Sequence, residues 1–233
     1  MDKYYTKPCN FYFGKQSEKK VKDKQSLPLG GNNSISFDSI EIISRKKSKF
    51  ININKINSLN KSLKEKINFD ISNIVKKKYF KKLNFINPPI LMGVINMTPD
   101  SFSDGGKFNK LSSATKRAKY FIKKGCKIID VGGESTRPGS KEINFRREWK
   151  RVESFLKKTK KLNCLISLDT RKSQIMEYAS KYKVDLVNDI SGLNYDVSTI
   201  EFLRKSKKPF VLHHSKGSPE NMQKKPVYKN VLL

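Results

Sequence analysis

The sequence has few of the features that mark membrane proteins, disulfide-rich proteins or zinc proteins. No apolar run reaches the ~18 residues of a membrane-spanning helix, and nothing after Met1 resembles a secretory signal. We therefore expect a cytoplasmic protein without a membrane partner. Its cysteines, Cys9, Cys126 and Cys164, are far apart and form no CxxC pair. This spacing argues against a zinc site or a disulfide framework and predicts buried thiols.

Acidic residues are also scarce. The chain has 21 Asp and Glu residues against 50 Lys and Arg residues, a net charge of +29. Such a charge is typical of nucleic-acid-binding proteins. Here the basic residues are spread over the whole chain, and no module interleaves them with aromatic residues. We interpret them as a solvated lysine-rich surface that attracts small anionic substrates, and we expect no nucleic-acid partner.

The 233 residues suit one domain with a modest appendage. We expect a basic, partly ordered N-terminal extension over residues 1–86 and a second domain over residues 87–233. Within the extension, the lysine- and glycine-rich residues 1–34 should be weakly ordered. Alternating apolar and polar residues predict a β-hairpin from 35–43 and 49–56, and helical spacing follows over 59–85.

From Ile90 the chain alternates short apolar runs with amphipathic stretches. This alternation predicts an α/β fold with parallel strands and right-handed crossovers, specifically a (β/α)8 TIM-type barrel. The near-continuous apolar runs predict strands that are covered on both faces. The predicted strands are 90–97, 127–135, 164–170, 185–192 and 209–217, and the predicted helices are 112–125, 144–161, 172–182 and 196–206.

Polar side chains follow each of these five strands at its carboxyl end. In a barrel these ends converge on one face, where the active site lies. Because neighbouring side chains on a strand face opposite ways, at most one of the two histidines should point into the barrel. The residues at the strand ends are Asn96; Glu134 to Arg137; Asp169; Asn188 and Asp189; and His213 and His214.

The first of these strand ends continues as "NMTPDSFSDGG" and offers the oxygens of Asn96, Asp100 and Asp104. Hard oxygen ligands suit Mg²⁺, which binds a few protein groups together with waters and substrate phosphates. The alternative is a loop of Asx turns with solvated aspartates.

Two further groups have both a functional and a structural interpretation. Arg137, in "GGESTRPGS", could bind a phosphate or carboxylate, or it could pair with Glu134. Asp169 and Asn188, at adjacent barrel positions, could together recognise a heterocycle with donor and acceptor edges. Alternatively, they could only tie neighbouring strand ends together.

Five segments together resemble dihydropteroate synthase in order and spacing: "MGVINMTPDSFSDGG", "DVGGESTRPGS", "SLDTRK", "VNDISG" and "VLHHSKGSPENMQ". The resemblance covers residues 90 to about 231. It implies that 4-aminobenzoate is joined to 6-hydroxymethyl-7,8-dihydropterin diphosphate with release of pyrophosphate, in folate synthesis.

The resemblance also implies roles for individual residues. Asn96 would bind the Mg²⁺ that holds the diphosphate. Asp169 would be the catalytic residue, stabilising positive charge as the C–O bond breaks. Loops 95–107 and 135–141 would close over 4-aminobenzoate. Their Gly, Ser and Pro content, between rigid strands, independently predicts that they are the most mobile parts of residues 90–217. The substrate-binding residues would be Thr136, Asp169, Asn188, Phe102, Arg137 and Pro138.

The resemblance leaves three points as expectations. The chain ends at Leu233, after about strand five, so we expect an incomplete barrel that is inactive alone; the complete enzyme could form a homodimer. One alternative is the pterin-binding domain of a methyltetrahydrofolate methyltransferase. Another is an inactive basic fragment that binds nucleic acid. The loops "TPDSFSDGG" and "ESTRPG" favour the synthase, because they would serve a diphosphate and an aminobenzoate.

Overall fold

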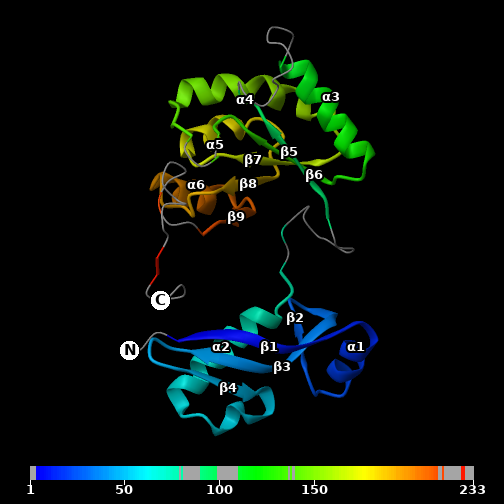
Figure 1. The fold of residues 1–233 in the computed structure, drawn as a ribbon, viewed down its shortest axis with the longest axis vertical. Helices are drawn as coiled ribbons and strands as arrows, with labels where there is room; N and C mark the ends of the chain where they lie inside the picture. Colours follow the sequence, from blue (N-terminus) through cyan, green and yellow to red (C-terminus); the bar gives the residue numbers. More distant parts are fainter. Residues whose placement is uncertain are drawn as a thin grey trace. The chain divides into compact units, whose positions relative to one another are not determined.

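The chain divides into two compact units in the computed structural model, and each is considered by itself. One unit holds residues 1–79 with 227–233, and the other holds residues 80–226. Figure 1 colours the chain from its N-terminus to its C-terminus. The residues that the structure describes are 4–78, 80, 90–98, 110–135, 137, 140–214, 217 and 227–228.

The N-terminal unit is an antiparallel sheet packed on a helix. Strand β3 is central: it pairs with β1, β2 and β4. The strands are β1 (Tyr5–Phe13), β2 (Leu27–Leu29), β3 (Asn32–Ile43) and β4 (Ser48–Asn52). The helices are α1 (Gly14–Lys22), the 3-10 helix η1 (Ile53–Ser58) and α2 (Lys61–Val75).

Two predictions for this unit are confirmed and one is wrong. The hairpin forms between β3 and β4, where Ile40 pairs with Ile51, and the helical spacing after residue 59 corresponds to α2. Residues 5–29 form β1, α1 and β2, although we expected weak order there. The reason is a long-range partner: β1 pairs with β3 from Tyr5 to Phe13, which local composition does not reveal.

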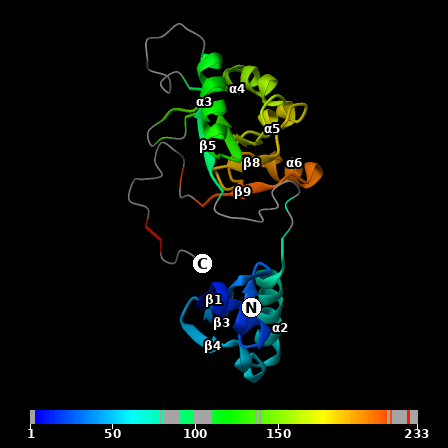
Figure 2. The same ribbon diagram turned by 90° about the vertical axis from the view of Figure 1, so that its right-hand side faces the viewer.

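The second unit contains a parallel five-stranded sheet in the order β5-β6-β7-β8-β9. Strand and helix alternate as predicted, and each helix connects two neighbouring strands (Figures 1 and 2). The strands are β5 (Met92–Asn96), β6 (Ile128–Gly132), β7 (Leu165–Asp169), β8 (Leu186–Asp189) and β9 (Phe210–Leu212). The helices are α3 (Lys110–Lys123), α4 (Phe145–Thr159), α5 (Ser173–Ala179) and α6 (Ser198–Ser206).

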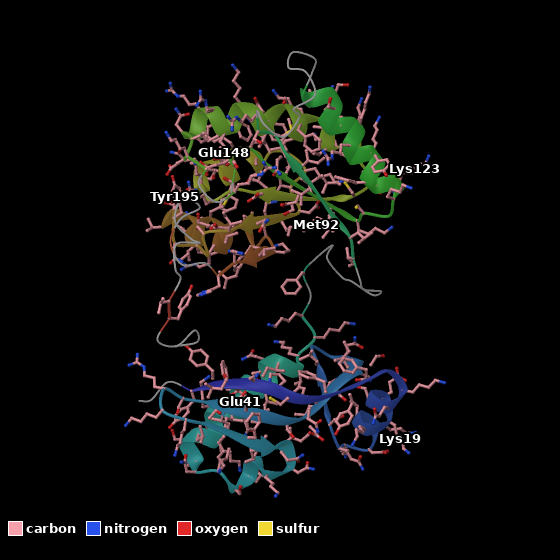
Figure 3. The ribbon with its side chains drawn as sticks, viewed as in Figure 1. Lys19, Glu41, Met92, Lys123, Glu148 and Tyr195 are labelled. Carbon is pink, nitrogen blue, oxygen red and sulfur yellow. The ribbon has the colours of Figure 1, made fainter. Side chains whose placement is uncertain are left out.

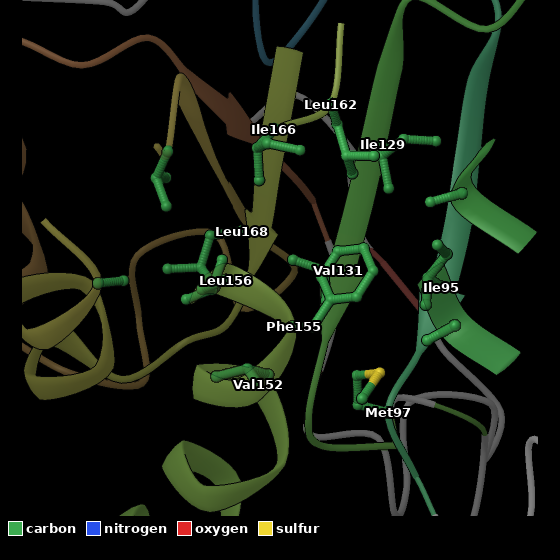
Figure 4. Close-up of a cluster of buried hydrophobic side chains, with 14 of the residues drawn as sticks. Ile95, Met97, Ile129, Val131, Val152, Phe155, Leu156, Leu162, Ile166 and Leu168 are labelled. Atoms are coloured by element: carbon green, nitrogen blue, oxygen red, sulfur yellow. The ribbon is translucent and has the colours of Figure 1, made fainter. Parts of the chain in front are cut away.

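The helices cover one face of this sheet, and the hydrophobic core of the unit lies between the helices and that face. Figure 4 shows apolar side chains from β6 and β7 meeting Phe155 and Leu156 of α4. These two residues are fully buried, and burying side chains of this size contributes ~1.5–3 kcal/mol each to folding. The strand residues on this face are Ile95, Ile129, Val131, Ile166 and Leu168.

On the opposite face, an inner strand of the sheet is buried, but the strands at its two edges are exposed. All five residues of β6 are buried, but Met92 and Val94 of β5 are 39% and 49% exposed and all of β9 is exposed. The prediction that every strand is covered on both faces is therefore wrong for β5 and β9. Among the described residues, helices pack against only one face. No helix in the described ranges is both long and apolar enough to cross a membrane.

Candidate functional site

Three of the predicted site residues lie in one row across the sheet. Asn96 pairs in register with Gly132, Gly132 with Asp169, and Asp169 with Asn188. Residues in register on parallel strands project to the same side, so the three polar side chains share a face at the carboxyl ends of their strands. Asp169 and Asn188 thus hold adjacent positions at the carboxyl ends of neighbouring strands, as predicted.

The fourth member of the row, Gly132, provides room for Asp169. A Cβ atom at Gly132 would lie 3.0 Å from Asp169 Oδ2 and 3.3 Å from Asp169 Cβ. Real Cβ atoms rarely approach other atoms so closely, since protein interiors are close-packed. The Asp169 side chain therefore leans over β6, in a space that only glycine leaves open.

Sequence reasoning missed Asp130, which lies two residues before Gly132 on the same face. Its side chain is 3% exposed, and its Oδ2 accepts a hydrogen bond of 3.2 Å from Asn188 Nδ2. Burial raises the pKa of the Asp130 carboxyl, and the polar side chains of Ser167 and Asn188 beside it partly offset this rise. The available signal was a lone acid inside the apolar run "KIIDVGG", because buried carboxylates are rare without a specific reason.

The electrostatics of the row are concentrated on Asp169. Burial raises the pKa of its carboxyl well above the usual value, and the negative charges of four nearby acids raise it further: Asp130, Glu148, Asp189 and Glu134. A desolvated carboxyl among other carboxylates binds a cationic or hydrogen-bond-donating ligand strongly, because such a ligand relieves the repulsion. A carboxyl with this perturbation at an open strand end is a functional-site candidate.

A buried ionic cluster lies beside the row and joins the loops that follow β6 and β7. Lys172 Nζ donates to Glu134 Oε1 at 3.0 Å and to Glu148 Oε2 at 2.8 Å, and Arg171 Nε donates to Glu134 Oε2 at 2.9 Å. Thr170 Oγ1 donates to Glu148 Oε1 at 2.6 Å. The cluster thus fixes the residues directly after Asp169 to α4 and to the start of the loop after β6.

The same cluster reaches the loop after β8. The guanidinium of Arg171 lies 4.1 Å from the ring centroid of Tyr195, whose hydroxyl donates to Glu142. Burial and the Glu142 carboxylate raise the pKa of Tyr195 to about 12. Tyr195 and Glu148 are both labelled in Figure 3. Three strand-end loops are therefore held together on the rim of the candidate site.

The structure places only some of the remaining predicted residues. Arg137 is exposed, and Glu134 accepts hydrogen bonds from Arg171, Lys172 and the backbone N–H of Ile143. The alternative pairing of Arg137 with Glu134 is therefore absent from the described contacts. Thr136, Phe102, Pro138, Asp100 and Asp104 lie outside the described residues, as does most of the two loops predicted to be mobile.

Asn96 and His213 are described. Asn96 is half-buried at the end of β5. His213 Nδ1 lies 3.0 Å from the carbonyl oxygen of Ile190, so this side chain contacts the loop after β8. The described part of the chain contains no group of three His, Cys, Asp or Glu side chains arranged to hold a metal ion. A metal at Asn96 would therefore need other oxygen donors.

A comparison of the whole sequence with known families decides its ancestry. Residues 92–232 match the family described as pterin binding enzyme. This chain belongs to that family. The match begins at β5 and includes the whole row from Asn96 to Asn188.

Other members of the pterin binding enzyme family are similar to this chain in sequence. It is 41% identical to dihydropteroate synthase of Neisseria meningitidis serogroup C over 63% of this chain and 53% of that protein. It is 39% identical to dihydropteroate synthase of Escherichia coli K12 over 63% and 52%. The chain spans about half the length of these curated relatives.

Solved structures of the family support the fold assignment. Yersinia pestis dihydropteroate synthase, solved with a sulfonamide drug, has a TM-score of 0.56 at 36% identity, covering 62% of this chain and 52% of that one. Xanthomonas albilineans dihydropteroate synthase, solved with 4-aminobenzoic acid, has a TM-score of 0.54 at 31% identity, covering 56% and 48%. The fold class is α/β, and the parallel sheet corresponds to part of a TIM-type barrel.

Proposed function

We propose that this chain carries the pterin-binding part of a dihydropteroate synthase. The reaction joins 6-hydroxymethyl-7,8-dihydropterin diphosphate to 4-aminobenzoate and releases pyrophosphate. The observation that carries the proposal is the row of Asn96, Asp169 and Asn188 on one sheet face, in a chain of the pterin binding enzyme family. The relatives named as dihydropteroate synthase support this choice within the family.

Asp169 and Asn188 would bind the pterin ring through its hydrogen-bond donors. The C–O bond to the diphosphate breaks and its electron pair leaves with the pyrophosphate. The amine nitrogen of 4-aminobenzoate then forms the new C–N bond and loses a proton. The acids around Asp169 favour positive charge on the pterin during this step, because preorganised negative charge stabilises a developing cation.

Four loop residues complete the proposed site. Thr136 would contact the pterin diphosphate, and Phe102, Arg137 and Pro138 would close over 4-aminobenzoate. The exposed position of Arg137 is compatible with a residue that reaches an incoming carboxylate. Closure of these loops would keep water from the reactive carbon.

We also propose that Asn96 is the protein ligand of a bound Mg²⁺. The amide oxygen of the half-buried Asn96 would occupy one coordination position. The diphosphate and waters would supply the others, because Mg²⁺ usually binds few protein groups and keeps several waters. When bound, the metal would neutralise negative charge on the departing diphosphate.

The proposal is tested by ligand binding. Calorimetry with the pterin diphosphate and Mg²⁺ should show saturable binding that Asp169→Ala and Asn188→Ala each weaken by at least about tenfold, from the loss of one buried hydrogen bond. Mg²⁺ should strengthen this binding in the wild type and should have little effect in Asn96→Ala, because Asn96 is the proposed protein ligand of the metal. Glu201→Gln, on the exposed face of α6, is the control. Absence of pterin binding, or equal binding by all variants, would refute the proposal.

A further inference from the structure

Asp130 connects two strands that are not neighbours. It lies on β6, and its hydrogen-bond partner Asn188 lies on β8. The strand between them is β7, where Ser167 pairs in register with Asp130. Because Ser167 is small, the Asn188 amide can reach across β7 to the carboxylate. The contact thus links the row of Asn96, Asp169 and Asn188 to Asp130 and Ser167, which lie two residues earlier on their strands.

We propose that Asp130 is a positioning residue that fixes the orientation of the Asn188 amide for ligand binding. This inference rests on the proposed function of the row, which it deepens. Asp130 itself is 3% exposed, so it acts through Asn188 and does not form the surface that the ligand meets.

The orientation follows from the chemistry of the two groups. An ionised carboxylate only accepts hydrogen bonds, whereas a primary amide has a donating end and an accepting end. With Nδ2 donating to Asp130, the carbonyl oxygen of Asn188 is left to face the ligand beside Asp169. The Asn188 carbonyl oxygen and the Asp169 carboxylate would then accept hydrogen bonds from neighbouring N–H groups of a heterocycle. A flipped amide would present a donor to the same edge and discriminate against that ligand.

Asp130 lowers the stability of the fold in two ways, and this supports a role in the site. Its negative charge contributes to the raised pKa of Asp169, so the two carboxyls repel each other. Its Oδ1 atom is buried and makes no hydrogen bond to any group in the described ranges. An unpaired buried oxygen destabilises a fold. Asn188 donates a hydrogen bond of normal length to this carboxylate, and the Ser167 hydroxyl beside it offsets only part of the effect of burial. The pairing with Asn188 therefore serves the site more than stability.

The first test observes the amide directly and needs no ligand. In nitrogen-15 spectra of the whole chain, the Asn188 side-chain protons, assigned by their loss in Asn188→Asp, should exchange slowly and show one strongly shifted signal. Asp130→Ala should abolish both properties. Asp130→Asn, which keeps an acceptor oxygen, should retain slowed exchange. Glu201→Gln, on the exposed face of α6, should leave the signals unchanged. An Asn188 amide that is the same in wild type and Asp130→Ala would overturn the inference.

The second test measures coupling with 6-hydroxymethylpterin as the probe. Asp130→Ala should weaken binding about tenfold, the usual effect of misplacing one hydrogen-bonding group. In the Asn188→Ala background the same change should have almost no effect, because Asp130 acts through that amide. Independent, multiplicative losses would overturn the positioning role. If wild type binds no pterin while the spectra behave as expected, the proposed function fails and the structural inference stands.

Discussion

At the scale of single residues, the candidate site contains charged groups whose burial lowers the stability of the native state. Asp169 is the clearest case, because burial and four neighbouring acids raise its pKa well above the usual value. The unfolded chain loses this proton at a pH near the ordinary pKa, but the native state holds it to higher pH. Stability therefore falls as pH rises from the unfolded pKa to the native pKa of Asp169.

Asp169→Asn should consequently stabilise the second unit at neutral pH. We expect a gain of about 1 kcal/mol, within the range usual for relieving strain at a functional site, and the gain should shrink as pH falls toward 4. Urea unfolding followed by the fluorescence of Trp149, the one tryptophan of the chain, measures it.

Asp196→Asn is the matched control with the opposite sign. Burial raises the pKa of Asp196, but hydrogen bonds from Ser173 and Ser198 outweigh this effect and lower it. Its carboxylate therefore stabilises the native state at pH values above the unfolded pKa. This variant should lose stability at neutral pH and lose less in acid. Equal responses of the two variants to pH would contradict the assignment.

Gly132→Ala should damage the site more than the fold. The new Cβ would lie 3.0 Å from Asp169 Oδ2, so the carboxyl must shift, and we expect pterin binding to fall by about tenfold or more. Gly93→Ala is the control, because its Cβ would meet the Phe121 ring at 2.5 Å on the helix side of the sheet. That variant should lower the urea midpoint yet bind pterin normally where folded. The reverse pattern would show that Gly132 serves packing and not Asp169.

At the scale of secondary-structure elements, the alternation of strands and helices could be predicted because it depends on local periodicity. The row of Asn96, Asp169 and Asn188 could be predicted because parallel strands bring their carboxyl ends together. Asp130 could not, since its role depends on the register across β7. Similarly, β1 contains Lys7 and Asn10 among its aromatic residues, so its own sequence gives a weak strand signal.

The ionic cluster was also beyond sequence analysis, because its partners are far apart in the chain. Lys172 contacts Glu134 and Glu148, which come from the loop after β6 and from α4. Side-chain exposures of 9%, 7% and 1% show that all three are desolvated. In such a cluster, removing one charge leaves its partners buried without compensation, which costs more than the intact pair contributes.

Lys172→Met should therefore lower the free energy of unfolding of the second unit by about 3 kcal/mol. Lys205→Met breaks the pair with Glu201 on α6, whose side chains are 75% and 66% exposed, and should change stability by no more than about 0.5 kcal/mol. Trp149 fluorescence in urea measures both. Similar losses for the two variants would show that burial does not distinguish these ion pairs.

At the scale of the whole molecule, the two compact units have separate hydrophobic cores. The N-terminal core is formed by β3, β4, η1 and α2, with Ile40, Ile67 and Ile71 among its residues. The core of the second unit lies between the helices and the parallel sheet. The family match starts at residue 92, so the pterin assignment concerns the second unit and leaves the N-terminal unit without an assigned role.

Separate cores predict separate unfolding transitions, because cooperativity follows the packing within a unit. Trp149 reports on the second unit alone, where it packs against Tyr178 and Tyr182. Ile166→Ala should lower the stability reported by Trp149 by ~2–5 kcal/mol, the cost of truncating a fully buried isoleucine. Ile67→Ala removes an equally buried side chain from the N-terminal core and should leave the Trp149 transition unchanged.

The effect of Ile67→Ala should appear instead in circular dichroism, as an earlier loss of signal that Trp149 does not follow. Two probes that give different midpoints are the established sign that a chain does not unfold in one step. If Ile67→Ala moves the Trp149 midpoint as far as Ile166→Ala does, the units unfold together. The N-terminal unit would then contribute to the stability of the sheet that carries Asn96, Asp169 and Asn188, and truncating it should weaken pterin binding in parallel with stability.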